Sequence, residues 1–285
     1  MCKIITPVYH LRNHFASSLE GFYSREEAFF MFYLLLEKKM GISKIEASFL
    51  TELTPQDTDY LHFVIQELKT HKPIQYILGV ADFYGKEFKV NPHTLIPRQE
   101  TEELVEQILK HLQNQSNLKI LDIGTGTGCI VIALASLMPH HHYEAWDISE
   151  NALQTAQQNA ERYELNIAFE TADIFNVSSL KTWDIIISNP PYVRHSEKSF
   201  IKQNVTDFEP ETALFVPDND PLLFYKTITV FAVKHLNPNG LLFFEINEVF
   251  GKEMQALLQE FGFSEIELWQ DFHGKDRFIK GKRTL

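Results

Sequence analysis

The spacing of apolar and polar residues changes twice along this chain of 285 residues and divides it into three parts. The first part, residues 1–72, carries three signals typical of helix starts: Ser24 with Glu27, Ser43 with Glu46, and Thr54 with Asp57, the last joined by Pro55. One helix has a broad apolar face formed by Phe29, Phe30, Phe32, Tyr33 and Leu36. Because aromatic residues at helical spacing usually pack into a core, this pattern predicts a small helical bundle.

The second part, residues 73–97, is rich in β-forming residues. Two short runs, Ile74–Leu78 and Phe83–Val90, are separated by Gly79 and Gly85. This pattern predicts a β-hairpin that links two domains.

The third part, residues 98–285, alternates apolar runs with amphipathic segments. The predicted strands are Lys119–Ile123, Tyr143–Asp147, Ile167–Glu170, Trp183–Ser188, Leu241–Glu245, Ile266–Trp269 and Arg277–Ile279. The predicted helices are Cys129–Leu137, Glu150–Tyr163 with Ser149 as its cap, Leu222–Leu236 and Val249–Phe261. Repeated βα units predict an α/β fold with a doubly wound, mostly parallel sheet. Ligands of such a sheet bind beyond the carboxyl ends of its strands.

Four residues after one predicted strand carry the clearest chemical signal: Asn189-Pro190-Pro191-Tyr192. Asn189 offers an amide oxygen, and the two prolines fix φ and remove backbone donors, so that carbonyl oxygens remain. Proline also holds the preceding Asn189 in an extended conformation. Tyr192 adds a flat face that can pack on a planar group. This corner is suited to binding a planar NH2 group, such as an amide or an aminopurine.

A glycine-rich loop follows the first strand of the third part, in the order Asp122-Ile123-Gly124-Thr125-Gly126-Thr127-Gly128. Glycines permit a tight turn and a close approach of the backbone to a ligand. Cys129 occupies the place of the third glycine of a dinucleotide fingerprint, and no Gly-Lys-Ser/Thr follows, which excludes a phosphate-binding P-loop. We assign Gly124, Thr125, Gly126 and Gly128 to cofactor binding.

Three acidic residues complete the predicted cofactor site. Asp147 ends the second strand, where related folds bind ribose hydroxyls, and Asp122 can accept from an ammonium group. Asp173 is placed to accept from an adenine amine, and Ile174 to cover the ring, while Ile148 belongs to the same set. Each Asp alone could be a turn former or helix cap. Together they favour S-adenosylmethionine over a nicotinamide cofactor.

Composition narrows the class of function. The formal charge of −12 disfavours a large nucleic-acid interface, because phosphate binding requires clustered Lys and Arg. No apolar run has the length of a membrane span, and we see no signal peptide. Two cysteines, Cys2 and Cys129, provide no disulfide framework. We therefore expect a cytoplasmic protein without direct nucleic-acid or membrane binding.

The loop, Asp147, Asp173 and the Asn189–Tyr192 corner resemble class I S-adenosylmethionine-dependent methyltransferases. More specifically, the chain resembles the protein-(glutamine-N(5)) methyltransferases of the PrmC/HemK type. Further segments carry this resemblance: Pro73–Gly79, Phe83-Tyr84-Gly85, Leu95–Glu102, Phe208–Leu214 and Asp276-Arg277. The chain departs from the family pattern at Gln99, where proline is frequent, and at Trp146, where a smaller residue is usual.

The resemblance implies a substrate and residue roles. The family methylates the glutamine of the Gly-Gly-Gln motif in class 1 peptide-chain release factors, and the helical domain would dock the protein substrate. Asn189, Pro190 and Tyr192 are the expected catalytic residues, with Asn189 also beside the cofactor. Pro191 and Arg98 join them in substrate binding. Arg98 could instead hold the loop on the cofactor side, or form an ion pair that orders the junction of the domains, and the role of Glu102 stays open.

Three other functions use similar features. A ribosomal-protein glutamine methyltransferase shares the tetrapeptide, and a DNA adenine methyltransferase needs a basic cleft that the charge disfavours. A non-catalytic binding protein would have no need of the Asn189 corner. We expect no metal site: the neighbouring residues His140, His141 and His142 lack convergent geometry. Cys129 is expected in the core, and Glu245 could simply cap a turn.

Overall fold

The computed structural model describes residues 8–49, 53–113 and 115–284, so Cys2 lies outside the described residues. The chain divides into two compact units. One contains the described part of residues 1–79 together with Lys202–Phe208, and the other contains Val80–Ile201 and Glu209–Leu285. Within the described ranges, no helix is long and apolar enough to cross a membrane.

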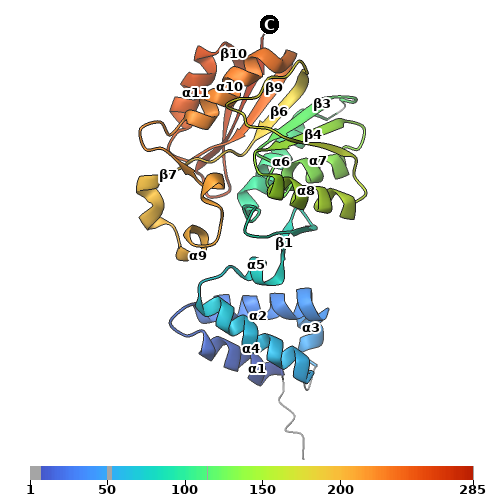
Figure 1. The fold of residues 1–285 in the computed structure, drawn as a ribbon, viewed down its shortest axis with the longest axis vertical. Helices are drawn as coiled ribbons and strands as arrows, with labels where there is room; N and C mark the ends of the chain where they lie inside the picture. The colour runs from blue at the N-terminus through green and yellow to red at the C-terminus, as the bar shows by residue number, and fades with distance from the viewer. Residues whose placement is uncertain (1–7, 50–52, 114, 285) are drawn as a thin grey trace, which may run out of the picture. The chain divides into compact units, whose positions relative to one another are not determined.

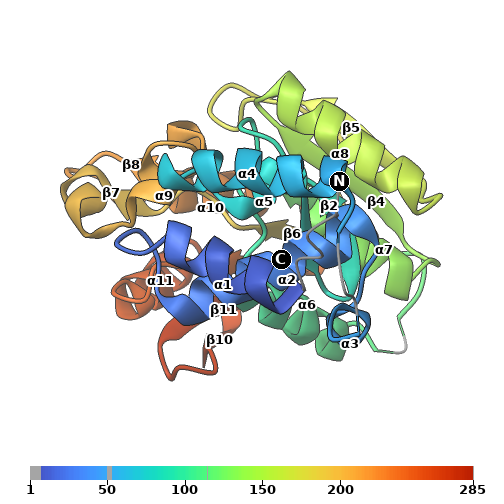
Figure 2. The same cartoon turned by 90° about the horizontal axis from the view of Figure 1, so that it is seen from below.

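The first unit is helical, as predicted. Its elements are α1 (Val8–Ser18), α2 (Arg25–Met40), α3 (Lys44–Ala47), α4 (Pro55–Lys69), α5 (Ile74–Leu78) and the separate α9 (Gln203–Thr206). The helices α1, α2 and α4 lie together in the first unit (Figure 2). The side chains buried between them include Phe15, Phe32, Leu36 and Leu68. Their aromatic core confirms most of the predicted stripe, but Phe30 is 65% exposed and points away from it.

All three predicted helix starts are present. Ser24 and Ser43 each form a complete capping box with a glutamate three residues later, and Thr54 accepts from the amide of Asp57. Local side-chain oxygens satisfy the free N–H groups of a first helical turn. These helix starts therefore need no tertiary contact, which is why the sequence predicts them well.

The predicted strand at Ile74–Leu78 is wrong, because these residues form helix α5. The carbonyl of Pro73 accepts from the amides of Tyr76 and Ile77, and Gly79 closes the helix in the left-handed region. A proline before a short run and a glycine after it favour one helical turn over a strand.

The hairpin begins only after α5. Its strands β1 (Val80–Phe83) and β2 (Lys86–Lys89) pair antiparallel, and both belong to the second unit. The two-residue turn, Tyr84 and Gly85, has φ values of 48° and 69°, as a type I′ turn requires. The separate linker domain that we predicted at residues 73–97 stays a prediction.

Seven strands of the described chain form the sheet of the second unit, in the order β10-β11-β9-β6-β3-β4-β5. They are β3 (Lys119–Ile123), β4 (His142–Asp147), β5 (Ile167–Thr171), β6 (Trp183–Ser188), β9 (Leu236–Glu245), β10 (Phe263–Gln270) and β11 (Asp276–Arg283). The pairs from β9 to β5 are parallel, while β10 and β11 are antiparallel. The predicted, mostly parallel sheet is confirmed.

Helices cover both faces of this sheet (Figure 1). On one face, α6 (Gln99–His111), α7 (Cys129–Leu137) and α8 (Glu150–Arg162) bury residues against inward side chains such as Ile120 and Phe243. On the other face, α10 (Leu223–His235) and α11 (Gly251–Glu260) pack on residues such as Leu121 and Phe244. Successive strand residues thus face opposite layers, which explains the continuous apolar runs in the sequence.

Trp146 belongs to the second of these layers. It is 1% exposed and contacts Trp183 and Phe231 edge to face. Its indole N–H donates to Glu144. This departure from the family pattern therefore fills the core behind the second strand.

A group of short strands and 3-10 turns follows β6 in the sequence. It contains β7 (Val193–Arg194), the 3-10 turns η1 (His195–Phe200) and η2 (Glu211–Ala213), and β8 (Phe215–Val216). The strands β7 and β8 pair in parallel. These elements were not predicted, because two to six residues are too few to show a periodic apolar pattern. Helices α1 and α6 were not predicted individually either, although α6 buries Leu104, Val105 and Ile108 at helical spacing.

Asn159 of α8 joins the hairpin to the glycine-rich loop. Its side chain accepts from the amide of Lys89 at 2.7 Å and donates to the carbonyls of Lys89 and Thr127, at 3.1 and 2.9 Å. Asn159 is 1% exposed, so no water replaces a lost partner. One buried amide thus holds two backbone segments in place.

We expect Asn159→Ala to lower the free energy of unfolding by roughly 2–4 kcal/mol, because it removes three buried hydrogen bonds. Urea unfolding measures this change. Gln158→Ala is the matched control. Among the described residues, its amide oxygen accepts only from the Lys89 ammonium on the surface, and its loss should cost under about 0.5 kcal/mol. Equal losses for the two variants would contradict the assigned role of Asn159.

Candidate active site

The carboxyl ends of four neighbouring strands bring the predicted site residues to one edge of the sheet. Ile123 of β3 lies opposite Ser188 of β6, so Gly124 and Asn189 leave the sheet side by side. The Ser188 hydroxyl donates to the Ile123 carbonyl at 2.7 Å, which reinforces this register. In the other direction, β4 ends at Asp147, beside the end of β5.

The glycine-rich loop is held open by its backbone. The amides of Gly124 and Thr125 both donate to the carbonyl of Trp146 at the end of β4. Gly124 and Gly126 have positive φ and open space where a Cβ would lie, so a ligand can approach the backbone there. The open space at Gly124 and Gly126 would allow the predicted contact between this loop and a cofactor, and the contact itself stays a prediction.

Gly128 has a different environment. A Cβ there would lie 2.9 Å from the Ile132 side chain and 3.2 Å from Ala156 of α8. Its amide donates to the carbonyl of Thr125. Gly128 thus permits close packing of α7 on α8, and its direct contact with a cofactor stays a prediction.

Asp147 is oriented by two backbone donors. Its carboxylate accepts from the amide of Gly126 in the loop and from that of Ser149, both at 2.9 Å. Burial raises the pKa of Asp147, and the two N–H groups oppose this shift. Further lone pairs remain on both oxygens, so that Asp147 can also accept from ligand hydroxyls.

Asp122 is the most strongly perturbed acid of the site. It is 1% exposed, and one oxygen accepts from the Thr125 hydroxyl at 2.7 Å. The other oxygen is buried and has no partner among the described residues. Burial raises the pKa of Asp122 to about 7, with a smaller contribution from the charge of Asp147. The Thr125 hydroxyl and the backbone N–H of Val131 oppose this shift. A buried carboxylate oxygen without a hydrogen bond can accept from a donor or cation of a ligand.

The remaining cofactor residues lie at the outer end of the edge. Ile148 follows Asp147 and is 63% exposed, which leaves an apolar surface beside the loop. Asp173 accepts from the amide of Phe175 and from the side chain of Asn176. Ile174 is half-buried and packs on the apolar layer below. Contact of Asp173 and Ile174 with an adenine ring stays a prediction.

The Asn189–Tyr192 corner is anchored at both ends. The Tyr192 carbonyl accepts from Asn247, and its hydroxyl donates to Glu245 at 3.3 Å. The Asn189 side-chain nitrogen donates to the Thr101 hydroxyl at 3.4 Å. The structure records no donor to the Asn189 oxygen among the described residues. The oxygen that we predict to bind substrate is therefore the one that the protein leaves free.

Glu245 and Thr101 complete the corner, although neither was predicted to belong to the site. Glu245 ends β9, is 1% exposed, and accepts from the Thr101 hydroxyl at 2.7 Å. Burial raises the pKa of Glu245, while the Thr101 hydrogen bond and the Arg277 charge oppose this shift. Two features of the sequence could have assigned these residues to the site. Thr101 lies in the Leu95–Glu102 segment that resembles the family, and Glu245 lies at the end of a predicted strand.

Arg98 and Glu102 both make structural contacts. Arg98 forms an ion pair of 2.6 Å with the buried Glu209, which also accepts from the amide of Ile96. Glu102 accepts from the amide of Tyr84 in the hairpin turn. Arg98 therefore balances a buried charge, and its contact with substrate stays a prediction.

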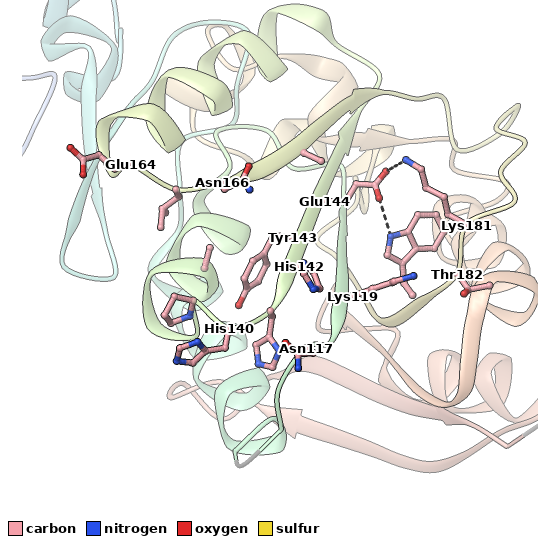
Figure 3. A pocket seen from close by; sticks show the side chains of 16 residues that line it. Asn117, Lys119, His140, His142, Tyr143, Glu144, Glu164, Asn166, Lys181 and Thr182 are labelled. Atoms are coloured by element: carbon pink, nitrogen blue, oxygen red, sulfur yellow. Dashed lines mark hydrogen bonds and ion pairs between the residues drawn. The ribbon is translucent and has the colours of Figure 1, made fainter.

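Two further expectations concern residues outside this edge. Cys129 is partly buried, and burial raises the pKa of its thiol to about 12, which disfavours a nucleophilic thiolate. The described residues contain no group of acids, histidines or cysteines suited to a metal ion. His140, His141 and His142 instead line a hollow of about 820 Å³ with Asn117 and Lys119, near the amino ends of β3 and β4 (Figure 3).

Some polar groups around this hollow are hydrogen-bonded. Glu144 accepts from the side chains of Lys181, Trp146 and Trp183. Figure 3 shows Lys181 facing Glu144. The His141 ring accepts from the amide of Leu118. The hollow lies at the opposite strand ends from Asn189 and the glycine-rich loop, and it contributes nothing to their site.

The fold and this edge define a class of protein. Residues 100–216 match the family described as Methyltransferase small domain. A crystal structure of a methyltransferase from Pyrococcus furiosus is similar in fold, with a TM-score of 0.53 and 16% identity over 79% of this chain and 99% of that one. The chain has the class I S-adenosylmethionine-dependent methyltransferase fold that we predicted.

Two relatives narrow the class to one family. The release factor glutamine methyltransferase of Flavobacterium psychrophilum is 44% identical over 279 residues, which cover 96% of this chain and 98% of the relative. The protein of the same name from Bacteroides thetaiotaomicron is 39% identical over 93% of this chain and 96% of its own. The chain belongs to the release factor glutamine methyltransferase family, which confirms the resemblance seen in the sequence.

The pKa of Asp122 predicts a pH-dependent effect on stability. In the unfolded chain this carboxyl ionises near its ordinary pKa of about 4, whereas in the folded protein it ionises only near 7. Ionisation therefore favours the unfolded state increasingly between these pH values. We expect Asp122→Asn to raise the free energy of unfolding above pH 7 by roughly 2–4 kcal/mol in the absence of cofactor.

Urea unfolding of the wild type and of Asp122→Asn at pH 4, 6 and 8 measures this difference. The gain should be largest at pH 8 and nearly absent at pH 4. If the difference in free energy of unfolding between the two proteins did not change with pH, the raised pKa of Asp122 in the folded protein would be contradicted.

Proposed function

We propose that this chain methylates the side-chain amide nitrogen of the glutamine in the Gly-Gly-Gln motif of class 1 peptide-chain release factors. The observation that supports this most directly is the Asn189–Tyr192 corner, which follows β6 beside the glycine-rich loop of β3. It presents acceptors to an NH2 group where a methyl donor would lie. The name shared by the relatives supplies the release factor as substrate.

The methyl donor of this family is S-adenosylmethionine, and the residues at the sheet edge fit it. The unpaired oxygen of Asp122 suits a cationic donor, Gly124 and Gly126 leave room for the ligand, and Ile148 offers an apolar surface for a ring. Asp147 would hold the ribose hydroxyls, and Asp173 the adenine amine. When bound, S-adenosylmethionine supplies a methyl group that is attached to a positively charged sulfur. After transfer of the methyl group, this sulfur is part of a neutral thioether.

The corner acts on the other reactant. A glutamine amide nitrogen is a poor nucleophile because its lone pair is delocalised into the carbonyl. The Asn189 oxygen and the Pro190 carbonyl accept its two N–H bonds and hold the nitrogen in line for transfer. The same oxygens stabilise the positive charge that develops on this nitrogen, and the extra proton leaves afterwards to water.

The neighbouring residues shape this pocket. Pro191 keeps the corner rigid, and the ring of Tyr192 packs on the amide plane, with its hydroxyl held by Glu245. Arg98, when paired with Glu209, orders the segment before α6, and a substrate carbonyl can accept from its remaining N–H groups. No general base is needed before transfer, because the methyl group is already strongly electrophilic.

Incubation with labelled S-adenosylmethionine tests the substrate. We expect label on the Gly-Gly-Gln glutamine of a purified release factor, and none on the same factor with that glutamine replaced by alanine. Peptide mass spectrometry of release factors from cells with and without this protein locates the methyl group. Label on a ribosomal protein or on DNA, and none on the release factor, would overturn the proposal, as would no label on any of them.

Two substitutions separate the two halves of the site. Asn189→Ala should lower single-turnover methyl transfer by roughly a hundredfold or more, because it removes an acceptor for the reacting amide. Its dissociation constant for S-adenosylmethionine should change by less than about threefold. Asp147→Ala should instead weaken cofactor binding by roughly 10- to 100-fold, because it removes charge-assisted hydrogen bonds.

Calorimetry measures binding, and rapid-quench kinetics measures transfer at saturating cofactor. Thermal unfolding of each variant confirms that it is folded. If Asn189→Ala lost cofactor binding but kept its rate of transfer, the two roles would be wrongly assigned.

A further inference from the structure

A chain of side-chain hydrogen bonds runs behind the Asn189 corner. It begins at Glu245, at the end of β9, passes through Thr101 in the first turn of α6, and ends at the side-chain nitrogen of Asn189. Glu245 and Thr101 are 1% and 3% exposed, so water does not take part readily. Three separate elements thus meet behind one carboxamide.

The direction of these bonds follows from the number of hydrogens. A threonine hydroxyl has a single hydrogen, and at 2.7 Å from the Glu245 carboxylate it donates there. The Thr101 oxygen can then only accept from Asn189. The Asn189 carboxamide must therefore turn its nitrogen to Thr101 and its oxygen away from it.

Glu245 is well suited to the role of acceptor. A second donor, the Tyr192 hydroxyl, reaches its other oxygen at 3.3 Å, and the backbone carbonyl of Glu245 accepts from Tyr225. Burial raises the pKa of Glu245, while the hydrogen bond from Thr101 and the positive charge of Arg277, on the neighbouring strand β11, oppose this shift. A carboxylate with two hydroxyl donors keeps both hydroxyl hydrogens turned towards itself.

We propose that Thr101 and Glu245 are positioning residues, which fix the Asn189 carboxamide with its oxygen towards the reacting amide. This inference rests on the proposed function and adds two residues to its site. Without the relay, the two ends of the carboxamide can exchange by rotation about its last side-chain bond. The flipped form would present an NH2 group to the NH2 group of the substrate, and the reacting nitrogen would lose its acceptor.

Thr101→Val tests the relay with little change of shape. We expect single-turnover methyl transfer at saturating S-adenosylmethionine to fall roughly 10- to 100-fold, since valine cannot accept from Asn189. The dissociation constant of the cofactor should change less than about twofold. Thr101→Ser restores the hydroxyl and should recover at least about half of the wild-type rate.

Thr229→Val is the matched control. Thr229 of α10 is fully buried, and its hydroxyl has no partner among the described residues. Its substitution by valine should leave both methyl transfer and cofactor binding unchanged. A rate for Thr101→Val equal to the wild type would overturn the proposal, and so would a Thr101→Ser variant as slow as Thr101→Val.

Glu245→Gln provides a second, independent variant. A glutamine can turn its NH2 group to Thr101, which then accepts from it and donates to Asn189, and this arrangement flips the carboxamide. We expect a loss of rate similar to that of Thr101→Val. Because both substitutions break one relay, the double variant should be no more than about twofold slower than the slower single variant.

Additive losses in the double variant would contradict a shared role. Failure of the proposed function would look different: the wild type itself would leave the Gly-Gly-Gln glutamine unlabelled. Thermal unfolding of every variant, measured with and without S-adenosylmethionine, ensures that the rates compare folded and cofactor-bound proteins.

Discussion

The parallel pairing of β3 with β6 is the constraint on which the rest of this structure depends. Because Ile123 lies opposite Ser188, the glycine-rich loop and the Asn189 corner leave the sheet at the same level. The backbone ladder is supported by the Ser188 hydroxyl bond across the two strands. A shift of one residue would turn the side chains of β6 to the opposite face and separate the two halves of the site.

Three carboxylates of the site are buried, although burial disfavours their charged form. Asp122, Asp147 and Glu245 all have pKa values raised by burial, and each is the last or the last but one residue of its strand. The apolar layers on both faces of the sheet supply the stability that allows this. The three carboxylates have different partners: Asp147 accepts from the loop amide of Gly126, one oxygen of Asp122 has no hydrogen bond within the described residues, and the two oxygens of Glu245 accept from Thr101 and Tyr192.

Sequence reasoning succeeded where the cause is local or strongly periodic. The helix starts at Ser24, Ser43 and Thr54 depend on residues three positions apart, and the strands β3 and β6 are short segments rich in isoleucine and other apolar residues. It failed at Ile74–Leu78, where a run with four apolar residues out of five was interpreted as a strand, although Pro73 before it and Gly79 after it favour one helical turn. In the structure the Pro73 carbonyl accepts from two amides of this turn, and Gly79 ends it in the left-handed region.

By itself, the sequence determined the kind of sheet, the loop that approaches a cofactor, and the Asn189 corner, because each follows from adjacent residues and their backbone preferences. Only the tertiary structure decided which groups share a hydrogen bond. Thr101 and Glu245 stand 144 positions apart, and Arg98 and Glu209 stand 111 apart. No local pattern relates such residues: their meeting is set by the order of the strands and by the helices that pack on them.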